Sequence, residues 1–280
     1  MKLIPTMPAA FELQNVTMSY PRSKTPALNN VSLVVPQNAI CGLFGRNAAG
    51  KTSLMALLAA FRRPTSGTVR VFGQDPYENP YIATQVAFIY ANNNPNSFVE
   101  SCNNYCKVRE LLKLGKKFRP TWGEDFAAHL CKRFDLNPKK WVGRLSLGQK
   151  AALRCTIGLA SRAPLTIFDE AYLGMDAIYR RIFVDELLAD YLRNPRTILF
   201  STHYVAEMER LFSEAIIINE GVVLAHDDAD SLRAGKGTQN IFNKTSAVAN
   251  TADTTTSSLQ DIFIRLAIKE GETYEPANFI

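Results

Sequence analysis

Long hydrophobic runs are missing from this sequence of 280 residues: no apolar stretch approaches the roughly 18 residues that a membrane-spanning helix needs. The five cysteines are odd in number and form no CxxC pair, which favours reduced cytosolic thiols over a disulfide framework. Cys102 and Cys106 would need two more ligands to hold a metal, and the sequence has only three histidines. Two prolines near the N-terminus interrupt the apolar core that a signal peptide requires, so we expect the chain to stay in the cytosol.

Charge is unevenly distributed along the chain. The composition, 46% hydrophobic and 21% charged, is ordinary for a globular protein and excludes a disordered chain. The net charge is +6, but residues 107–150 hold twelve Lys and Arg against four Asp and Glu, a net charge of +8 that leaves −2 for the remainder. Such a basic stretch fits an anionic surface, either lipid headgroups or nucleic acid, or it is an ordinary solvated helix face.

Apolar runs that alternate with helical stretches predict an α/β fold with a mostly parallel central sheet. The expected buried strands are residues 39–44, 86–90, 164–169, 197–202 and 214–219. The expected helices are residues 52–61, 149–161, 177–193 and 204–213. Three shorter strands, at residues 11–20, 31–36 and 68–72, predict a small antiparallel sheet near the N-terminus.

Two regions differ from this alternation. Residues 100–145 are basic, lack an apolar strand run and show helical stretches around 106–117 and 124–135, so we interpret them as a helical subdomain inserted between sheet strands. After about residue 235 the sequence becomes small and polar, which is typical of a linker or exposed loop. Apolar residues within 258–269 then recur at helical spacing and predict a terminal helix that docks on the domain or on a partner.

The segment GRNAAGKT at residues 45–52 matches the phosphate-binding pattern G-x-x-x-x-G-K-[ST] in full. A buried strand leads into it and a helix follows, so backbone N–H groups at the helix start would point at phosphate oxygens. In this pattern Gly50 permits close approach of the backbone, Lys51 reaches the β- and γ-phosphates, and Thr52 offers its hydroxyl to Mg²⁺. The predicted nucleotide-binding residues are Gly45, Arg46, Asn47, Ala48, Ala49, Gly50, Lys51, Thr52 and Ser53.

The segment LTIFDE at residues 165–170 ends a buried strand with two acids. A carboxylate at the C-terminal end of a parallel strand faces the ligand crevice of such folds. We therefore expect Asp169 to hold Mg²⁺ through a water and Glu170 to orient or deprotonate the attacking water. Taken alone, two such acids are more often a solvated turn, and the phosphate loop upstream is what favours the catalytic interpretation.

A third segment, LSLGQK at residues 145–150, precedes a helix and resembles the signature, usually LSGGQ, of the ATP-binding cassette (ABC) ATPases. Ser146 lies 23 residues before Asp169, the spacing of that family. The resemblance implies that Ser146, Leu147, Gly148 and Gln149 meet ATP bound to a second subunit. A plain helix cap formed by Ser146 presents the same N–H groups, so both interpretations hold together.

Further segments resemble the same family in the same order. FRRPTSGTVRVFG at 61–73 is similar to its LRPTSGxVxVxG stretch, and LGMD at 173–176 resembles the D-loop, which implies that Asp176 lies at the dimer seam. STHYVAEME at 201–209 resembles the switch region, which implies that His203 lies near the γ-phosphate. Tyr20 falls where the family has an aromatic residue that stacks on adenine, or else it is a strand-end tyrosine of the sheet.

Within the family the chain resembles the ATPase subunits of type-2 ABC exporters, because SLQDIFIRL at 258–266 is similar to their C-terminal SLEDxFxxL helix. The resemblance implies an ATP-binding domain at 1–234, a helical subdomain inserted at about 95–160, and a C-terminal extension at 235–280. It implies ATP and Mg²⁺ as cofactors and ATP hydrolysis that powers export through a separate integral-membrane permease. The expected partners are that permease and a second nucleotide-binding subunit, identical or different, at the inner face of the cell membrane, with no specific nucleic acid.

Several positions depart from the family pattern. Ala48 replaces the usual glycine of NGAGK, Leu147 replaces a signature glycine, and Ala171 replaces the proline after the catalytic glutamate. The Q-loop glutamine is missing, and Ala91 or Asn92 occupies its place. Asn92 could still reach Mg²⁺ or water, but its side chain is one methylene shorter than that of glutamine. Because the phosphate loop is intact, we expect weaker coupling to the permease rather than weaker nucleotide binding.

Two other classes of function stay open from the sequence. A soluble mechano-ATPase that remodels protein or nucleic-acid complexes would suit the basic stretch, although long coiled-coil insertions and tandem cassettes are absent from the sequence. An ATP-gated binding module without turnover would suit the missing glutamine, whereas Glu170 and His203 argue against it.

Overall fold

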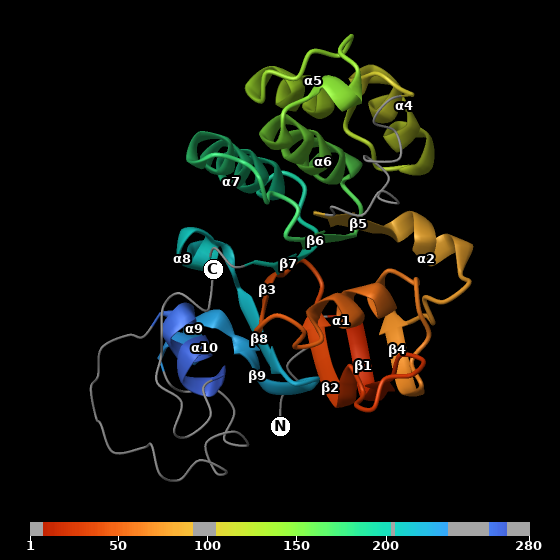
Figure 1. Ribbon diagram of the computed structural model, residues 1–280, viewed down its shortest axis with the longest axis vertical. Coiled ribbons are helices and arrows are strands. Elements are labelled where there is room, and N and C mark those ends of the chain that lie inside the picture. Colours follow the sequence, from red (N-terminus) through yellow and green to blue (C-terminus); the bar gives the residue numbers. More distant parts are fainter. Residues whose placement is uncertain (1–7, 92–104, 203–204, 235–257, 268–280) are drawn as a thin grey trace. The chain divides into compact units, whose positions relative to one another are not determined.

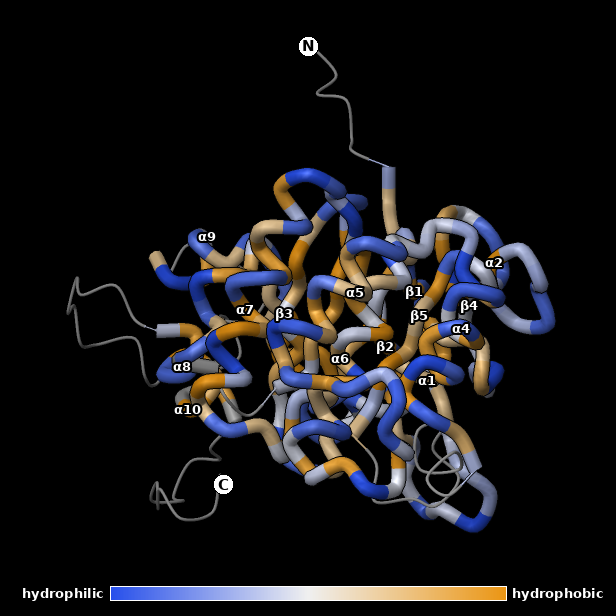
Figure 2. Tube along the Cα trace, turned by 90° about the horizontal axis from the view of Figure 1, so that it is seen from above, coloured by the Kyte–Doolittle hydropathy of each residue, from blue (hydrophilic) through white to orange (hydrophobic). Residues whose placement is uncertain are grey.

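The structure is a computed structural model that describes residues 8–91, 105–202, 205–234 and 258–267 (Figure 1). The chain divides into two compact units, one made of Met1–Glu78 and Leu199–Ile280 and the other of Asn79–Ile198. Figure 2 shows hydrophilic segments gathered at the outer turns of the trace and hydrophobic segments inside. Among the helices of the described ranges, none is long and apolar enough to cross a bilayer.

The first unit contains a small antiparallel sheet with the strand order β2-β1-β4. Its strands are β1 (Ala9–Met18), β2 (Leu28–Pro36) and β4 (Ser66–Val71). Alternation of apolar and polar residues places Leu13 opposite Leu33 on one side and opposite Val69 on the other, and all three side chains are buried. Helix α1 (Lys51–Leu58) lies against β4 (Figure 1). The small antiparallel sheet predicted from the sequence is confirmed.

The same unit contains a second group of paired strands. Strand β3 (Ile40–Phe44) is buried at every residue and runs parallel to β8 (Glu214–Asn219), as expected for a strand covered on both faces. Strand β9 (Val222–Asp228) pairs antiparallel with β8 through a turn of two residues. These residues, Glu220 and Gly221, have φ values of 47° and 77°, the left-handed conformation that tight hairpins favour.

The helix predicted over residues 204–213 ends earlier than expected. Helix α8 (Val205–Met208) gives way to one 3-10 turn (Glu209–Leu211), and the chain then becomes extended. The N–H group of Ser213 donates a hydrogen bond of 2.9 Å to the carbonyl of Ile40. Pairing with the start of β3 therefore overrides the local helix propensity.

The terminal helix α10 (Leu259–Ala267) docks on the first unit, against α8 and α9 (Ala229–Arg233). The carboxylate of Glu209 links α10 to α9, because it accepts hydrogen bonds from the N–H of Leu259 at 2.7 Å and from Arg233 Nε at 3.2 Å. Leu259 is fully buried. Of the two alternatives predicted for this helix, the structure thus shows docking on the domain.

The second unit contains the parallel pair β5 (Val86–Tyr90) and β6 (Leu165–Asp169), and β7 (Thr197–Ser201) begins in it. Its helices are α2 (Pro80–Gln85), α4 (Val108–Phe118), α5 (Glu124–Arg133), a 3-10 turn (Val142–Arg144), α6 (Leu147–Ser161) and α7 (Ala177–Tyr191). Helix α6 is buried continuously from Ala151 to Ser161, because it contacts α4, α5, α7 and both strands (Figure 1).

The parallel pairs β3–β8 and β5–β6, the antiparallel pair β8–β9 and the separate antiparallel sheet give the chain the α/β fold that the sequence predicted. The boundaries expected for the helical subdomain, at about 95–160, and for the C-terminal extension, at 235–280, stay predictions.

A buried ionic cluster lies at the C-terminal end of α7. The side chain of Asp190 is only 2% exposed and accepts hydrogen bonds from Arg162 Nη2 at 2.7 Å, Arg196 Nη1 at 2.9 Å and Asn194 Nδ2 at 3.0 Å. Burial lowers the pKa of Arg196, and the neighbouring Asp190 carboxylate acts in the opposite direction. The Asp190 carboxylate that receives these bonds thus offsets part of the cost of burying the Arg196 charge.

The cysteines of the described ranges are free thiols, in agreement with the expected reduced state. Burial raises the pKa of Cys131 to about 11 and that of Cys155 to about 12. Because the thiolate is the reactive form, both side chains are nearly inert at neutral pH and serve as small apolar core residues.

Candidate active site

The phosphate loop connects β3 to α1 in the first unit, as the sequence predicted. Helix α1 begins at Lys51, and the preceding Gly50 has φ 109°, a conformation open to glycine at little cost. A Cβ on Gly50 would lie 2.5 Å from the carbonyl oxygen of Ala27. The structure therefore gives Gly50 a packing reason for lacking a side chain, in addition to the close approach of phosphate that the pattern implies.

Positive charge is concentrated at the start of α1. The Lys51 side chain is 7% exposed, and its Nζ donates hydrogen bonds to the carbonyl oxygens of Gly45 and Arg46, the latter at 3.1 Å. The first turn contains no acidic residue, and the N-cap glycine has no side chain that could cap it. The positive end of the helix dipole and the Lys51 ammonium group thus lie together at the start of α1. Their combined positive potential suits the phosphate groups of a nucleotide.

A distant hairpin supports the phosphate loop, a feature that the sequence analysis missed. The N–H of Gly221 donates a hydrogen bond of 2.9 Å to the carbonyl of Ala49, and the carbonyl of Gly221 accepts one of 2.8 Å from Asn29. A Cβ on Gly221 would lie 2.8 Å from the Ala27 oxygen. The available signal was a glycine in a two-residue turn between two apolar strands.

The departure at Ala48 is visible in the backbone. Ala48 has φ 63°, in the left-handed region where a Cβ costs about 1–2 kcal/mol. The glycine usual at this position in the family would adopt the same φ without that strain. The side chain is exposed, so the substitution affects the local backbone energy of the loop rather than core packing.

Tyr20 lies beside the phosphate loop in the same unit. Its hydroxyl is 3.1 Å from the Ser53 hydroxyl, so one donates a hydrogen bond to the other. The guanidinium of Arg62 lies over its ring, 5.7 Å from the centroid. Tyr20 is thus half-buried next to α1, a position compatible with a base-stacking role, and that role stays a prediction.

The two predicted catalytic acids end strand β6 in the second unit. The carbonyl of Asp169 accepts a hydrogen bond of 2.9 Å from the N–H of Ala91, which extends the pairing of β5 with β6 by one residue. Glu170 follows with φ 50°, an uncommon conformation for a non-glycine residue. The next residues, Ala171 and Tyr172, are buried. A strained glutamate between a buried strand and a buried turn is held in one backbone conformation, which suits a group that must be positioned.

The signature segment forms a capping box at the start of α6. The N–H of Gln149 donates to Ser146 Oγ at 3.1 Å, and Gln149 Oε1 accepts from the N–H of Ser146 at 3.3 Å. The Gln149 oxygen also accepts from Lys140 Nζ at 3.1 Å. The helix-cap interpretation of Ser146 is thus confirmed, and its contact with a partner's ATP stays a prediction.

The D-loop segment contacts the signature segment within the second unit. Gly174 has φ 96°, and a Cβ built on it would lie 2.8 Å from Leu147 Cγ. Leu147 is 62% exposed, and its side chain lies against Gly174. Asp176 caps α7, because its Oδ1 accepts a hydrogen bond of 2.8 Å from the N–H of Tyr179. The leucine that departs from the family signature therefore packs on the D-loop glycine.

The structure brings the predicted site residues together in two groups. The phosphate loop and Tyr20 meet in the first unit, whereas the β6 acids, the signature and the D-loop belong to the second. His203 and Asn92 lie outside the described residues. The individual roles of all these residues stay predictions.

Comparisons with known proteins identify the class. The family model described as "ABC transporter" matches residues 28–173. The bacitracin transport ATP-binding protein BcrA of Enterococcus faecalis is 31% identical over 218 residues, which cover 77% of this chain and 68% of that protein. The doxorubicin resistance ATP-binding protein DrrA of Mycobacterium tuberculosis is 27% identical over 238 residues, 81% of this chain and 68% of DrrA.

Solved structures share the fold. An ATP-binding subunit of an ABC transporter has a TM-score of 0.72 at 20% identity and covers 92% of this chain and 99% of its own. A dimeric ATP-binding cassette in a post-hydrolysis state with ADP and Pi has a TM-score of 0.65 at 18% identity, with coverages of 78% and 98%. The chain belongs to the ABC transporter family and is an ATPase of the ABC type that binds ATP.

Proposed function

We propose that the chain is the ATP-hydrolysing subunit that powers export of a substrate through a separate integral-membrane permease. The observation that carries the proposal is the similarity to BcrA and DrrA, whose names state bacitracin transport and doxorubicin resistance. The docked helix α10 adds support, because it contains all but the first residue of the SLQDIFIRL segment that resembles type-2 exporter subunits. Through the permease, the chain would lie at the inner face of the cell membrane, without a specific nucleic-acid partner.

The proposed roles follow from the chemistry of each group. Lys51 and the N-terminus of α1 bind the phosphates, and the Tyr20 ring stacks on the base. The Thr52 hydroxyl and, through water, Asp169 would supply the oxygen ligands that Mg²⁺ prefers, and the ion would neutralise charge on the phosphates. Glu170 accepts a proton from the attacking water, and the family resemblance implies a role for His203 at the γ-phosphate.

The experiment that tests the proposal is purification of the tagged chain from detergent-solubilised membranes of its own cells. We expect a polytopic membrane protein encoded beside the gene of this chain to co-purify. Vesicles reconstituted with both proteins should hydrolyse ATP faster than the chain alone, because docking on a permease brings two cassettes together. A Lys51→Ala chain is the matched control, since it should still co-purify but show no ATP-driven increase.

The alternative function, remodelling of a protein or nucleic-acid complex, is not favoured, because the relatives described above are named for transport or drug resistance. It predicts a different result in the same experiment. A complex without any membrane protein would then co-purify, and this outcome would contradict the export proposal.

We further propose that each active site is shared by two chains. Ser146, which caps α6, and the first residue of the helix are exposed, and the ABC resemblance directs this helix end toward ATP held by the phosphate loop of a second chain. The phosphate loop and the signature also belong to different units of the chain.

Mixing two inactive variants tests the shared site. In a homodimer, Lys51→Ala and Ser146→Arg each break both sites. A mixed dimer contains one doubly broken site and one intact site, so ATP hydrolysis should return in part when the two proteins are mixed. Turnover should also rise more than linearly with protein concentration. Full activity of protein held below its dimerisation range would contradict the proposal.

A further inference from the structure

Helix α4 presents a stripe of basic side chains to solvent. The helix buries Val108 and Leu111 on one face. The opposite face exposes four cationic residues, Arg109, Lys113, Lys116 and Lys117, which are called the α4 stripe below. Their spacing of four, three and one residues places them on one side of a helix, along about 12 Å of its axis. This stripe forms the N-terminal part of the basic segment that the sequence analysis singled out.

Few acids oppose these cations within the described part of the unit. Lys116 pairs with Glu124 at 3.2 Å and Arg109 with Glu110 at 3.9 Å, and all four side chains are between 45% and 65% exposed. Exposed pairs of this kind contribute little binding energy and exchange readily with other anions. The α4 stripe therefore retains an excess of positive charge that can act on a surface beyond the protein.

Exposed aromatic rings flank the α4 stripe at both ends. Tyr105, which precedes the helix, is 85% exposed, and Phe118, its last residue, is 60% exposed. Near the N-terminal end, Lys107 Nζ lies 5.3 Å from the centroid of the Trp141 ring, and Trp141 is 39% exposed. Aromatic and basic residues side by side are typical of segments that lie in a membrane interface.

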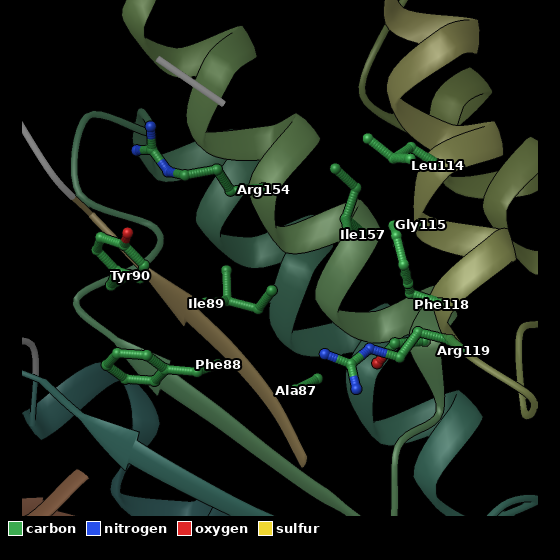
Figure 3. A pocket seen from close by; sticks show the side chains of 11 residues that line it. Ala87, Phe88, Ile89, Tyr90, Leu114, Gly115, Phe118, Arg119, Arg154 and Ile157 are labelled. Atoms are coloured by element: carbon green, nitrogen blue, oxygen red, sulfur yellow. The ribbon is translucent and has the colours of Figure 1, made fainter. Parts of the chain in front are cut away.

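An apolar pocket adjoins the same helix. Its volume is about 260 Å³, and Leu114 and Phe118 of α4 line it together with Ile89 of β5 and Ile157 of α6 (Figure 3). Two cationic side chains, Arg119 and Arg154, also belong to its wall. Phe118 thus belongs both to this apolar lining and to the exposed end of the helix. A nucleic-acid surface would instead require a positively charged groove that follows the phosphate backbone. The combination of a short basic stripe and flanking rings favours a lipid surface.

We propose that α4 docks directly on the anionic headgroups of a membrane. The α4 stripe supplies the electrostatic attraction, and Tyr105 and Phe118 enter the interfacial layer. Each basic residue near an anionic leaflet strengthens binding by about fivefold at physiological ionic strength. Four such residues with two rings give reversible attachment rather than insertion. This contact with lipid goes beyond the proposed export function.

Co-sedimentation of the purified full chain with permease-free vesicles tests the proposal. One vesicle contains only phosphatidylcholine, and in the other about one lipid in three is phosphatidylglycerol. We expect binding to the anionic vesicle alone, and we expect added salt to weaken it, because the attraction is screened. The double variant Lys113→Gln, Lys117→Gln should lose about 25-fold in affinity, which corresponds to two cationic contacts.

The matched control removes the same charge elsewhere in the unit. Lys132 and Arg193 are exposed and lie off α4, so the double variant Lys132→Gln, Arg193→Gln should bind anionic vesicles within about twofold of the unchanged chain. Both double variants should keep the melting temperature and the ATP hydrolysis rate of the unchanged chain, because all four residues are exposed and lie outside the predicted site.

Three results would overturn the proposal: equal binding to both vesicles, equal losses in the two double variants, or capture of a single-stranded oligonucleotide by a chain that ignores anionic vesicles. Tyr105→Ser provides a second measurement, since loss of one interfacial ring should weaken binding severalfold without a change in salt dependence. Because the vesicles contain no permease, failure here would leave the export proposal standing, and failure to find a permease would leave this result standing.

Discussion

Glu170→Gln should lower ATP turnover by on the order of a hundredfold or more while nucleotide affinity changes little, since a positioned base contributes about that much. The amide has the shape of the carboxylate but cannot accept the proton of the attacking water. The backbone should not move, because Glu170 sits at φ 50° between buried β6 and the buried Ala171. Turnover is measured by phosphate release under saturating ATP, and affinity by titration with a fluorescent nucleotide.

Glu78 offers a matched control for this variant. It has φ 51°, nearly the same left-handed backbone, and its exposed carboxylate approaches Arg63 only to 3.9 Å. Glu78→Gln makes the same chemical change at a position outside the predicted site, so turnover should stay within about twofold, as for ordinary surface changes. Near-normal hydrolysis by Glu170→Gln would show that the base is another group.

Asp190→Ala should lower the free energy of unfolding by about 3–5 kcal/mol, the usual cost of removing one partner of a buried ion pair. Without the carboxylate, the Arg196 side chain stays 3% exposed with no compensating charge, and Arg162 and Asn194 lose their acceptor. The loss is measured by urea unfolding followed by circular dichroism.

Asp185→Ala on the same helix is the control for that prediction. Asp185 pairs with Arg181 at 3.0 Å, but the two side chains are 47% and 79% exposed, so the cost should be below about 1 kcal/mol. Similar losses for the two variants would contradict the assignment of Asp190 as a buried anchor. Their difference reports the burial and the additional partners of Asp190, because residue type, helix and substitution are the same.

The sequence predicted the phosphate loop and the parallel strands because their signals are local. The loop pattern spans eight residues, and each buried strand is a continuous apolar run bounded by turn residues. The alternation in β1 likewise predicts one buried and one exposed face without knowledge of its partners. These features follow from short-range sequence, which is why the fold class was predictable.

The features that the sequence did not predict depend on residues far apart in the chain. Gly221 supports the phosphate loop from about 170 residues away, and no local pattern links the two. The early end of α8 has the same origin, because Phe212 leaves the helix to pack edge-on against Phe44, with ring centroids 5.5 Å apart. In α7, Asp190 continues the buried positions Phe183 and Leu187 at helical spacing, so an acid in an apolar stripe was the signal that could have revealed its cluster.

The capping box at Ser146 has a stereochemical consequence for the proposed shared site. A hydroxyl has two acceptor lone pairs and one proton to donate. In the cap, Ser146 Oγ uses one lone pair for the N–H of Gln149. The hydroxyl proton of Ser146 remains available as a donor, so Ser146 can hydrogen-bond to a phosphate oxygen without unwinding of the helix end. A carboxylate would cap α6 equally well but would bring a second negative charge to the phosphate. Among the common capping side chains, a hydroxyl can therefore cap the helix and donate a hydrogen bond to a phosphate oxygen at the same time.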